Sequence, residues 1–343
     1  MNHNERFCSA AAVTPRAGVF ESLLNWYSRE RRDLPWRRGV DAYGVLVSEI
    51  MLQQTRVEVV IPYYQRFMAR FASPAELAAA SLDEVYEYWA GLGYYRRARN
   101  LQAAAQAVVA GGGFPQDLEG LRALPGVGEY TAAAVLSIAF GRPAVALDGN
   151  AIRVLSRFYA LREGLTAARR RELIERVLPL IPEDRAGDFT QALMELGARL
   201  CVPRGARCLV CPLTKNCQAR AQGLVDSIPA PTPRGRREKV ELLALRIRRG
   251  HQVLLERREQ DPFLAGQWVT PWFFRDEGVV ERYRTEFPGT PVAVGRVSHG
   301  VTFRDLSIEV WDWETTGEEC GPGRRWAGPE ARLPRLATLV LGV

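Results

Sequence analysis

The sequence predicts a mainly helical domain followed by a small α+β domain. Residues 1–226 are rich in alanine and leucine and carry apolar residues at helical spacing. Residues 239–343 instead contain short stretches in which apolar and polar residues alternate, as in half-buried strands. Between them, residues 227–238 contain three prolines and three arginines, a composition typical of an exposed linker. A chain of 343 residues is long enough for two such domains.

Apolar spacing defines the helices predicted in the first domain, and glycine or proline separates them. The breaks lie at residues 111–113, 125–128 and 141–143. The predicted helices span residues 21–29, 42–56, 74–90, 96–110, 130–139, 152–159, 167–180 and 188–200.

Alternation of apolar and polar residues defines the strands predicted in the second domain. A strand over residues 240–248 places Leu243, Leu245 and Ile247 on one face, and the Arg249-Gly250 turn leads to a second strand over 252–257. A third alternating stretch covers residues 306–313, and the tail after Arg332 is typical of a short apolar helix.

The chain is basic, with a net charge of +7 and an isoelectric point near 9.3. This balance favours a polyanionic partner, although a solvated basic surface is the alternative. Only Lys215 and Lys239 of the 46 basic residues are lysines, so a catalytic lysine has two candidates. The sequence has no recognisable signal peptide or membrane span, which predicts a cytoplasmic protein without a membrane partner.

The most specific local signal is a group of four cysteines with the spacing C-x6-C-x2-C-x5-C. Disulfides are disfavoured, because a long chain without a secretory signal does not need them. Zinc sites usually combine two C-x2-C pairs or include histidine, whereas four cysteines alone suit a [4Fe–4S] cluster. We therefore expect an iron–sulfur cluster, with zinc as the alternative. The predicted ligands are Cys201, Cys208, Cys211 and Cys217.

Residues 124–132, LPGVGEYTA, form a glycine-containing turn before a predicted helix. Backbone N–H groups at a helix N-terminus attract phosphate, so Gly126 and Gly128 are candidate phosphate-binding residues. The alternative is that these glycines serve only helix packing.

Two acidic residues lie beside apolar runs. Glu49, in SEIMLQQTRV, has mostly apolar neighbours, and its pKa should rise if it is buried. The alternative places it on the polar face of its helix. Asp148, in LDGN, ends an apolar run, where an aspartate is most often the N-cap of the following helix.

Together, these features resemble the helix-hairpin-helix DNA glycosylase superfamily. The runs MLQQTRV, GLGYYRRARNL and LDGNAIRVLSR, starting at Met51, Gly91 and Leu147, resemble the MutY family of adenine DNA glycosylases. The resemblance extends from Leu34 to about Trp313 and is weaker after Glu238. It implies a monomeric enzyme that removes adenine mispaired with 8-oxoguanine or guanine from duplex DNA, with a [4Fe–4S] cluster as its cofactor.

The resemblance also implies catalytic roles. Glu49 matches the general acid that protonates N7 of adenine, and Asp148 matches the carboxylate that stabilises or attacks the sugar cation. Tyr130 and Asn150 match polar partners that orient Asp148 and the sugar. Glu195 matches a residue that lines the adenine pocket, and the alternative is that it is only a charged residue on the surface of its helix. The residues that match the lining of the adenine pocket are Leu34, Trp36, Arg37 and Glu195.

Relatives of the endonuclease III type place a lysine nucleophile in the hairpin. Here the matching residue is Tyr130, and no lysine precedes Asn150. Cleavage of the DNA strand through an enzyme-bound imine is therefore disfavoured. This substitution predicts a monofunctional glycosylase.

Access to a base within a duplex requires flipping of its nucleotide. Gln54 and Tyr94 match the residues that insert into the base stack, while a core position for Tyr94 or Tyr95 is the alternative. The cluster loop carries Lys215, so the cluster shapes a basic loop; redox sensing is the alternative. The side chains expected to contact phosphates are Arg56, Arg97 and Lys215.

The second domain resembles a Nudix fold but lacks the REx2EE magnesium-binding helix, so nucleotide hydrolysis is not expected. The family recognises 8-oxoguanine with a loop reading roughly H-x-F-S-H. Here His299 and Thr302 match this loop, while Phe303 replaces the final histidine and weakens the expected recognition. A plain β-strand is the alternative for this segment.

Two other functions remain open from the residues. A thymine- or uracil-mismatch glycosylase on the same scaffold is compatible with Tyr130. A non-catalytic iron–sulfur protein that binds DNA is the other alternative, but the presence of Glu49 and Asp148 argues against it.

Overall fold

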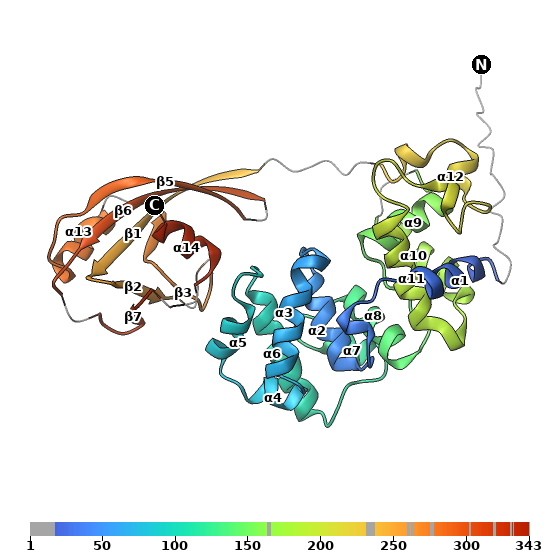
Figure 1. Cartoon of the computed structure of the whole chain (residues 1–343), viewed down its shortest axis with the longest axis horizontal. Coiled ribbons are helices and arrows are strands. Elements are labelled where there is room, and N and C mark those ends of the chain that lie inside the picture. The colour runs from blue at the N-terminus through green and yellow to red at the C-terminus, as the bar shows by residue number, and fades with distance from the viewer. Residues whose placement is uncertain are drawn as a thin grey trace, which may run out of the picture. The chain divides into compact units, whose positions relative to one another are not determined.

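A computed structural model describes residues 18–162, 166–230, 237–258, 261, 264–274, 278–301, 303–317, 320–329, 331 and 333–342 (Figure 1). The chain forms two compact units, Met1–Glu49 with Phe114–Thr232, and Ile50–Gly113 with Pro233–Val343. These units differ from the predicted domains of residues 1–226 and 239–343, because the chain leaves the first unit within one helix and returns at Phe114.

The first unit is helical. Helix α11 packs against α1, α8 and α9, and the rings of Phe20, Phe158 and Phe189 meet in the core. Its helices are α1 (Glu21–Glu30), the start of α2 (Ala42–Leu52), α7 (Leu118–Ala123), α8 (Glu129–Phe140), α9 (Gly149–Phe158), α10 (Ala167–Val177), α11 (Ala186–Arg199) and α12 (Gln218–Ala221). Its 3-10 turns are η1 (Pro35–Arg37), η2 (Leu178–Leu180), η3 (Glu183–Arg185), η4 (Cys208–Val210) and η5 (Val225–Ser227).

Two glycines of α11 allow the neighbouring helices to approach closely. A Cβ atom on Gly187 would lie 2.9 Å from the carbonyl oxygen of Ser137 on α8. A Cβ atom on Gly197 would lie 2.6 Å from the Cβ atom of Asn150 on α9. Because such contacts are too short for any side chain, these glycines bring α8, α9 and α11 together.

The helical part of the second unit contains α3 (Val57–Arg70), α4 (Pro74–Ala79), α5 (Leu82–Trp89) and α6 (Arg96–Ala110). The helix predicted over residues 96–110 is confirmed, since α6 begins and ends at these two residues. The predicted helix over 42–56 is too long, since α2 ends at Leu52 and Gln54 has a positive φ of 58°. The predicted helix over 74–90 is two helices, because the Ser81 side chain caps a new helix by accepting from the N–H of Glu84.

The C-terminal part of the second unit is a seven-stranded sheet with the order β3-β2-β1-β6-β5, in which β4 pairs with β1 and β7 with β2. Strand β1 runs parallel to β6 and antiparallel to β2. The three predicted strands are confirmed within two residues at each end. The strands are β1 (Glu238–Arg249), β2 (Gln252–Arg257), β3 (Trp268–Val269), β4 (Trp272–Phe274), β5 (Val292–Val301), β6 (Arg304–Glu314) and β7 (Arg324–Ala327).

Each face of the sheet packs against one helix. Helix α13 (Gly278–Glu286) contributes Val279 and Tyr283 to a core with Leu243, Leu245 and Ile247, the face predicted from alternation. Helix α14 (Arg335–Leu341), predicted as the apolar tail, packs on the opposite face beside Leu242 and Ala244. The mainly helical and α+β fold class is therefore confirmed.

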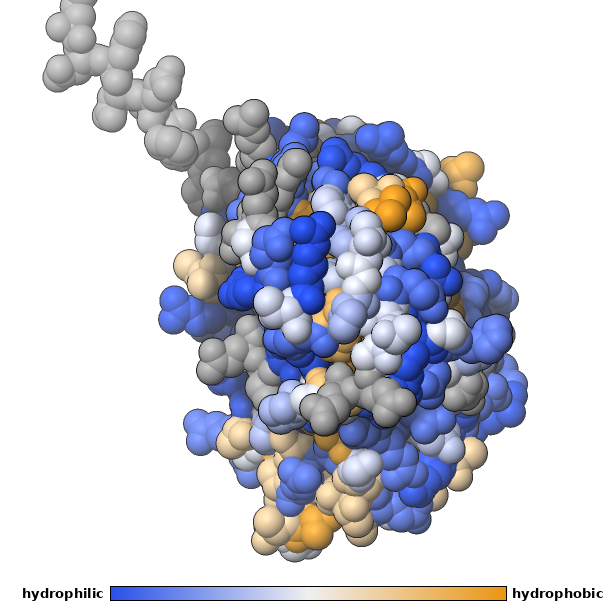
Figure 2. Space-filling view, turned by 90° about the vertical axis from the view of Figure 1, so that its left-hand side faces the viewer, coloured by the Kyte–Doolittle hydropathy of each residue, from blue (hydrophilic) through white to orange (hydrophobic). Residues whose placement is uncertain are grey.

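Polar residues dominate the side of the molecule in Figure 2, where apolar side chains form only small separate areas. No helix within the described ranges combines the length and the apolar character needed to span a bilayer.

Candidate active site

Glu49 lies on α2 and is buried, with 5% of its surface exposed. The alternative that places it on a polar helix face is therefore wrong. Burial raises the pKa of this carboxyl to about 7, opposed by a hydrogen bond from Tyr130. The nearby Asp148 raises this pKa further, and Arg37 lowers it. At neutral pH, Glu49 is thus divided between its proton-donating and charged forms.

Tyr130 is the direct partner of Glu49. It lies in the first turn of α8, and its hydroxyl donates a hydrogen bond to Oε2 of Glu49. The Sδ atom of Met194, on α11, lies 4.0 Å from the same hydroxyl. Burial and then the charge of Glu49 raise the pKa of Tyr130 well above its ordinary value, so the phenol keeps its proton.

Asp148 is the N-cap of α9, as the alternative reading predicted. Its Oδ1 accepts from the N–H of Ala151 at 2.6 Å, and its Oδ2 accepts from Nδ2 of Asn150 at 2.9 Å. Burial raises the pKa of Asp148, while these two donors oppose the shift. The cap and the position beside Glu49 are compatible, because the cap fixes the carboxylate in place.

Arg153, one turn further along α9, fixes Asn150 in turn. Its guanidinium donates to Oδ1 of Asn150 at 2.9 Å and to the carbonyls of Gly197 and Cys201, each at 2.8 Å. Because the amide of Asn150 accepts from Arg153, its Nδ2 must face Asp148. The orientation of this pair is therefore fixed.

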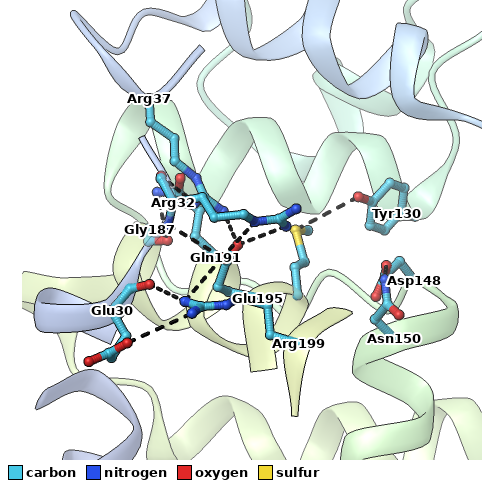
Figure 3. A network of polar contacts seen from close by, with 11 residues as sticks. Glu30, Arg32, Arg37, Tyr130, Asp148, Asn150, Gly187, Gln191, Glu195 and Arg199 are labelled. Carbon is cyan, nitrogen blue, oxygen red and sulfur yellow. Dashed lines mark hydrogen bonds and ion pairs between the residues drawn. The ribbon is translucent and has the colours of Figure 1, made fainter. Parts of the chain in front are cut away.

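Glu195 is fully buried and occupies the centre of an arginine network, so its alternative as a surface charge is wrong. Arg32 binds both of its oxygens, at 2.8 and 3.1 Å, and Arg37 binds Oε2 at 3.0 Å. Burial opposes the charge, but Arg32 and Arg37 hold the pKa of Glu195 below its usual value. Figure 3 shows Tyr130, Asp148 and Asn150 on one side of this network.

The other residues expected in the adenine pocket lie around η1. Leu34 and Trp36 are buried, with 5% and 8% of their surface exposed. Arg37 lies with its guanidinium 5.5 Å from the ring centre of Tyr27 and contacts Glu195. The structure therefore groups Glu49, Tyr130, Asp148 and Asn150, and it places Arg37 and Glu195 in a neighbouring network. Whether these residues line an adenine pocket stays a prediction.

The predicted hairpin joins α7 to α8. Leu124 and Val127 are buried, whereas Gly126 and Gly128 are exposed. Gly126 has a φ of 74°, which favours glycine, and Gly128 is the N-cap of α8. The apolar residues anchor the turn, so the first N–H groups of α8 are directed to a surface.

The four cysteines line one cavity between α9, α11 and the following loop. Arg157 holds this loop by donating to Sγ of Cys201 at 3.4 Å and to the carbonyl of Val202 at 2.7 Å. In the described ranges, no three His, Cys, Asp or Glu side chains are close enough to hold a single metal ion. The identity of a group bound by the four cysteines therefore stays a prediction.

Comparison with known proteins shows which proteins the chain is similar to. The model of the HhH-GPD superfamily of base excision DNA repair proteins matches residues 47–180. The chain is 46% identical over 226 residues to adenine DNA glycosylase from Homo sapiens, covering 62% of this chain and 41% of that protein. It is 38% identical over 220 residues to the one from Buchnera aphidicola subsp. Acyrthosiphon pisum, covering 62% of each. These matches show that the chain is similar to the HhH-GPD superfamily and, within it, to adenine DNA glycosylases.

Solved structures share the fold of the helical part of the chain. A thermostable thymine-DNA glycosylase is 30% identical, with a TM-score of 0.54 over 59% of this chain and 94% of the other. A trapped endonuclease III–DNA intermediate, 23% identical with a TM-score of 0.51, covers 60% and 95% and shares the fold. The chain spans about half the length of the curated mammalian relatives that it matches, covering 43% of the Rattus norvegicus protein and 52% of the Mus musculus protein.

The two residues predicted to insert into a base stack, Gln54 and Tyr94, lie in the second unit. Gln54 and Tyr94 have positive φ values of 58° and 50°, which non-glycine residues rarely adopt. Tyr94 is 42% exposed, while Tyr95 is buried, so the core aromatic of this pair is Tyr95. Both candidate residues are therefore on tight, exposed turns.

Arg97 requires a correction. It was expected to contact a phosphate, but only 9% of its surface is exposed. Its guanidinium donates to backbone carbonyls, including those of Ile50 at 2.9 Å and Leu92 at 3.2 Å. Arg56 and Lys215 are exposed, and their contact with phosphates stays a prediction.

The segment predicted to recognise the lesion is only partly described. His299 is half-buried on β5 and pairs with Leu306 across the β5–β6 ladder. Thr302 lies outside the described residues. Phe303 is 58% exposed, with the guanidinium of Arg304 5.0 Å from its ring centre.

Three residues of this site were not predicted from the sequence: Arg32, Arg153 and Met194. The spacing of Asn150 and Arg153, three residues apart on one helix, is a signal that could have indicated their contact. Arg32 gives no such signal, because its contact with Glu195 joins residues 163 positions apart.

Proposed function

We propose that this chain is a monofunctional glycosylase that removes adenine mispaired with 8-oxoguanine or guanine from duplex DNA. The observation that carries the proposal is a buried glutamate with a pKa near 7, hydrogen-bonded to a tyrosine and close to a second carboxylate. Enzymes that break glycosidic bonds generally use two carboxyl groups whose different environments give them different pKa values. The family assignment supplies adenine as the base.

Glu49 is the general acid in this proposal. Adenine leaves poorly as an anion, so a proton delivered to N7 makes it a neutral leaving group. The apolar surroundings keep a large fraction of Glu49 protonated at neutral pH. Tyr130 holds Oε2 of Glu49 and so directs the other oxygen, Oε1, to the base.

Asp148 stabilises the sugar cation that remains after adenine leaves. Both of its oxygens accept hydrogen bonds, so its charge is fixed in place before the reaction. Those bonds also weaken the carboxylate as a nucleophile. We therefore favour electrostatic stabilisation, followed by attack of water, over a long-lived covalent ester.

Duplex DNA reaches the site by base flipping. In the proposal, the exposed turns of Gln54 and Tyr94 fill the space that the flipped adenine leaves. The α7–α8 hairpin binds the DNA backbone through Gly126 and Gly128. Arg56 and Lys215 add exposed positive charges that bind phosphates without reading the sequence.

Recognition of the opposite base is assigned to the C-terminal sheet. His299 and Thr302 are the proposed contacts to 8-oxoguanine. Phe303 cannot donate the hydrogen bond of an imidazole, so we propose weaker discrimination against guanine than the matching histidine would give.

The four cysteines are proposed to hold a [4Fe–4S] cluster that shapes the loop around Lys215. The cavity that the four cysteines line adjoins α9, which begins after Asp148 and contains Asn150, and α11, which contains Glu195. In this role, the cluster supplies structure and takes no part in the bond-breaking steps.

Anaerobically purified protein is expected to be brown and to contain about four iron atoms per chain. Replacing Cys208 by alanine should remove the iron and weaken DNA binding, while Cys320→Ala, at a free cysteine in the C-terminal sheet region, should leave both unchanged. Iron and zinc are measured by elemental analysis. Stoichiometric zinc without iron would contradict the cluster assignment.

The activity itself is tested by single-turnover cleavage of labelled duplexes that carry adenine, thymine or uracil opposite each base. Adenine opposite 8-oxoguanine or guanine should be released, and strands should break only after alkali or heat. Borohydride should trap no appreciable enzyme–DNA adduct, because Tyr130 occupies the hairpin position of the lysine.

Release of thymine or uracil instead of adenine would favour the mismatch glycosylase alternative. Duplex binding without release of any base would favour the non-catalytic alternative. Efficient trapping that persists in the Lys215→Arg, Lys239→Arg double variant would identify another amine as nucleophile and contradict the monofunctional assignment.

A further inference from the structure

Arg97 is a buried cation whose hydrogen bonds join two separate turns. On one side, Nη1 donates to the carbonyls of Ile50 at 2.9 Å, Met51 at 3.0 Å and Gln53. On the other side, Nη2 donates to the carbonyls of Leu92 and Gly93, each at 3.2 Å. The same Nη2 reaches Oγ1 of Thr55 at 3.3 Å. One planar group thus binds residues 50–55 and residues 92–93.

These two turns carry the candidate insertion residues. The carbonyl of Gln53 immediately precedes Gln54, and that of Gly93 immediately precedes Tyr94. The guanidinium also lies 5.3 Å from the ring centre of Tyr94. Since both Gln54 and Tyr94 have positive φ, their strained turns need support from surrounding contacts.

The chemistry of Arg97 favours a positioning role. Each of these acceptors is a neutral oxygen, and Nε is buried without a hydrogen-bond partner in the described structure. Burying a positive charge among neutral partners is costly, so stability alone does not account for it. A planar guanidinium can bind carbonyls on two sides at once, which a lysine ammonium cannot do with the same geometry.

We propose that Arg97 is a positioning residue that holds the Gln54 and Tyr94 turns at a fixed separation, so that both side chains enter the base stack together. This inference rests on the proposed function. The inference adds that Gln54 and Tyr94 act as one unit, because the buried side chain of Arg97 sets the distance between their turns.

Arg97→Lys and Arg97→Met are the variants that test this role. The matched control is Gln102→Met, because Gln102 is a buried residue of the same helix α6 that donates to the carbonyls of Leu77 and Ala80, away from both turns. The first readout is the fluorescence of 2-aminopurine beside the mispair, which reports unstacking on binding. It is recorded at fixed salt in the Glu49→Gln background, so that no base is released.

At saturating protein concentration, both Arg97 variants should lose most of the unstacking signal. Gln102→Met should retain that signal when its thermal stability matches that of the Arg97 variants. The second readout is the single-turnover rate of adenine release in the chain with Glu49 intact. There, Arg97→Lys should cost about a hundredfold, the effect of displacing a positioning group by about 1 Å. In the Gln54→Ala, Tyr94→Ala background the same change should cost less than about threefold, since Arg97 acts through these residues.

An equal loss in both backgrounds, or a full unstacking signal in Arg97→Lys, would overturn the positioning role. Unstacking that depends on Arg97 without release of adenine by the native chain would instead overturn the proposed function and leave this inference standing. If Arg97→Met does not fold, the lysine variant, which keeps the charge, provides the measurement.

Discussion

Glu49→Gln is expected to lower the single-turnover rate of adenine release by at least about a hundredfold, because it removes the general acid. Binding to a mispaired duplex at fixed salt should change little, since the proton is needed only as the bond breaks. Excision at the native rate by this variant would remove Glu49 from the mechanism.

The pH dependence of the native rate provides an independent check on Glu49. Because the acid must be protonated, the rate should fall as pH rises through about 7, the pKa of this carboxyl. In Tyr130→Phe, the charged form of Glu49 loses its hydrogen bond, so the pKa rises and the falling limb should move to higher pH. A limb that stays in place would assign the titration to another group.

Glu49→Gln should also make the chain more stable at pH 8. The folded carboxyl has a pKa near 7, above its ordinary value of 4.5, so folding favours the protonated form. That stabilising contribution is complete below about pH 4.5 and is lost as pH rises through about 7. A neutral glutamine avoids the loss, and the variant should gain on the order of 3 kcal/mol relative to the native chain at pH 8. The free energies of unfolding of the native chain and of Glu49→Gln, measured below about pH 4.5 and at pH 8, check the sign of this difference.

Asp148→Asn is expected to cost between about a hundredfold and a thousandfold in single-turnover rate, the range for losing a fixed electrostatic partner of the transition state. Asparagine is as good an N-cap as aspartate, so the bond to the N–H of Ala151 and the start of α9 should persist. The loss should therefore appear in the chemical step without a large change in the free energy of unfolding.

Asp117→Asn is the matched control for this variant. Asp117 caps α7 by accepting from the N–H of Gly120 at 2.8 Å, and its fractional exposure is much greater. This change should preserve both stability and rate. If Asp148→Asn retains the native rate, the carboxylate serves as a helix cap alone.

Local patterns predicted much of the helical architecture. The cap of α9 is an example: Asp148 was recognisable as an N-cap, although the helix begins at Gly149, three residues before the predicted start at residue 152. Helix α3 was missed, because its sequence VEVVIPYYQRFMAR contains β-branched residues and Pro62, which lower helix propensity. Strand β5 was missed because most of its side chains are exposed on the edge of the sheet, so its alternation is weak.

The burial of charged side chains was harder to predict from the sequence than the residue types that form the candidate site. Arg97 and Glu195 have ordinary surface residue types, and only the fold shows that each is enclosed. The partners of Glu195 include Arg32 and Arg37, which are distant in sequence, and those of Arg97 are backbone carbonyls, which any sequence provides. No local pattern distinguishes such residues from solvated neighbours.

Helix α2 has a mechanical consequence. Glu49 is followed directly by Ile50 and Met51, whose carbonyls hold Arg97. If Arg97 positions the Gln54 and Tyr94 turns as proposed, the last turn of α2 connects this positioning residue to Glu49, the proposed proton donor. Substitutions at Arg97 should then alter both the unstacking of the mispair and the rate at which its adenine is released.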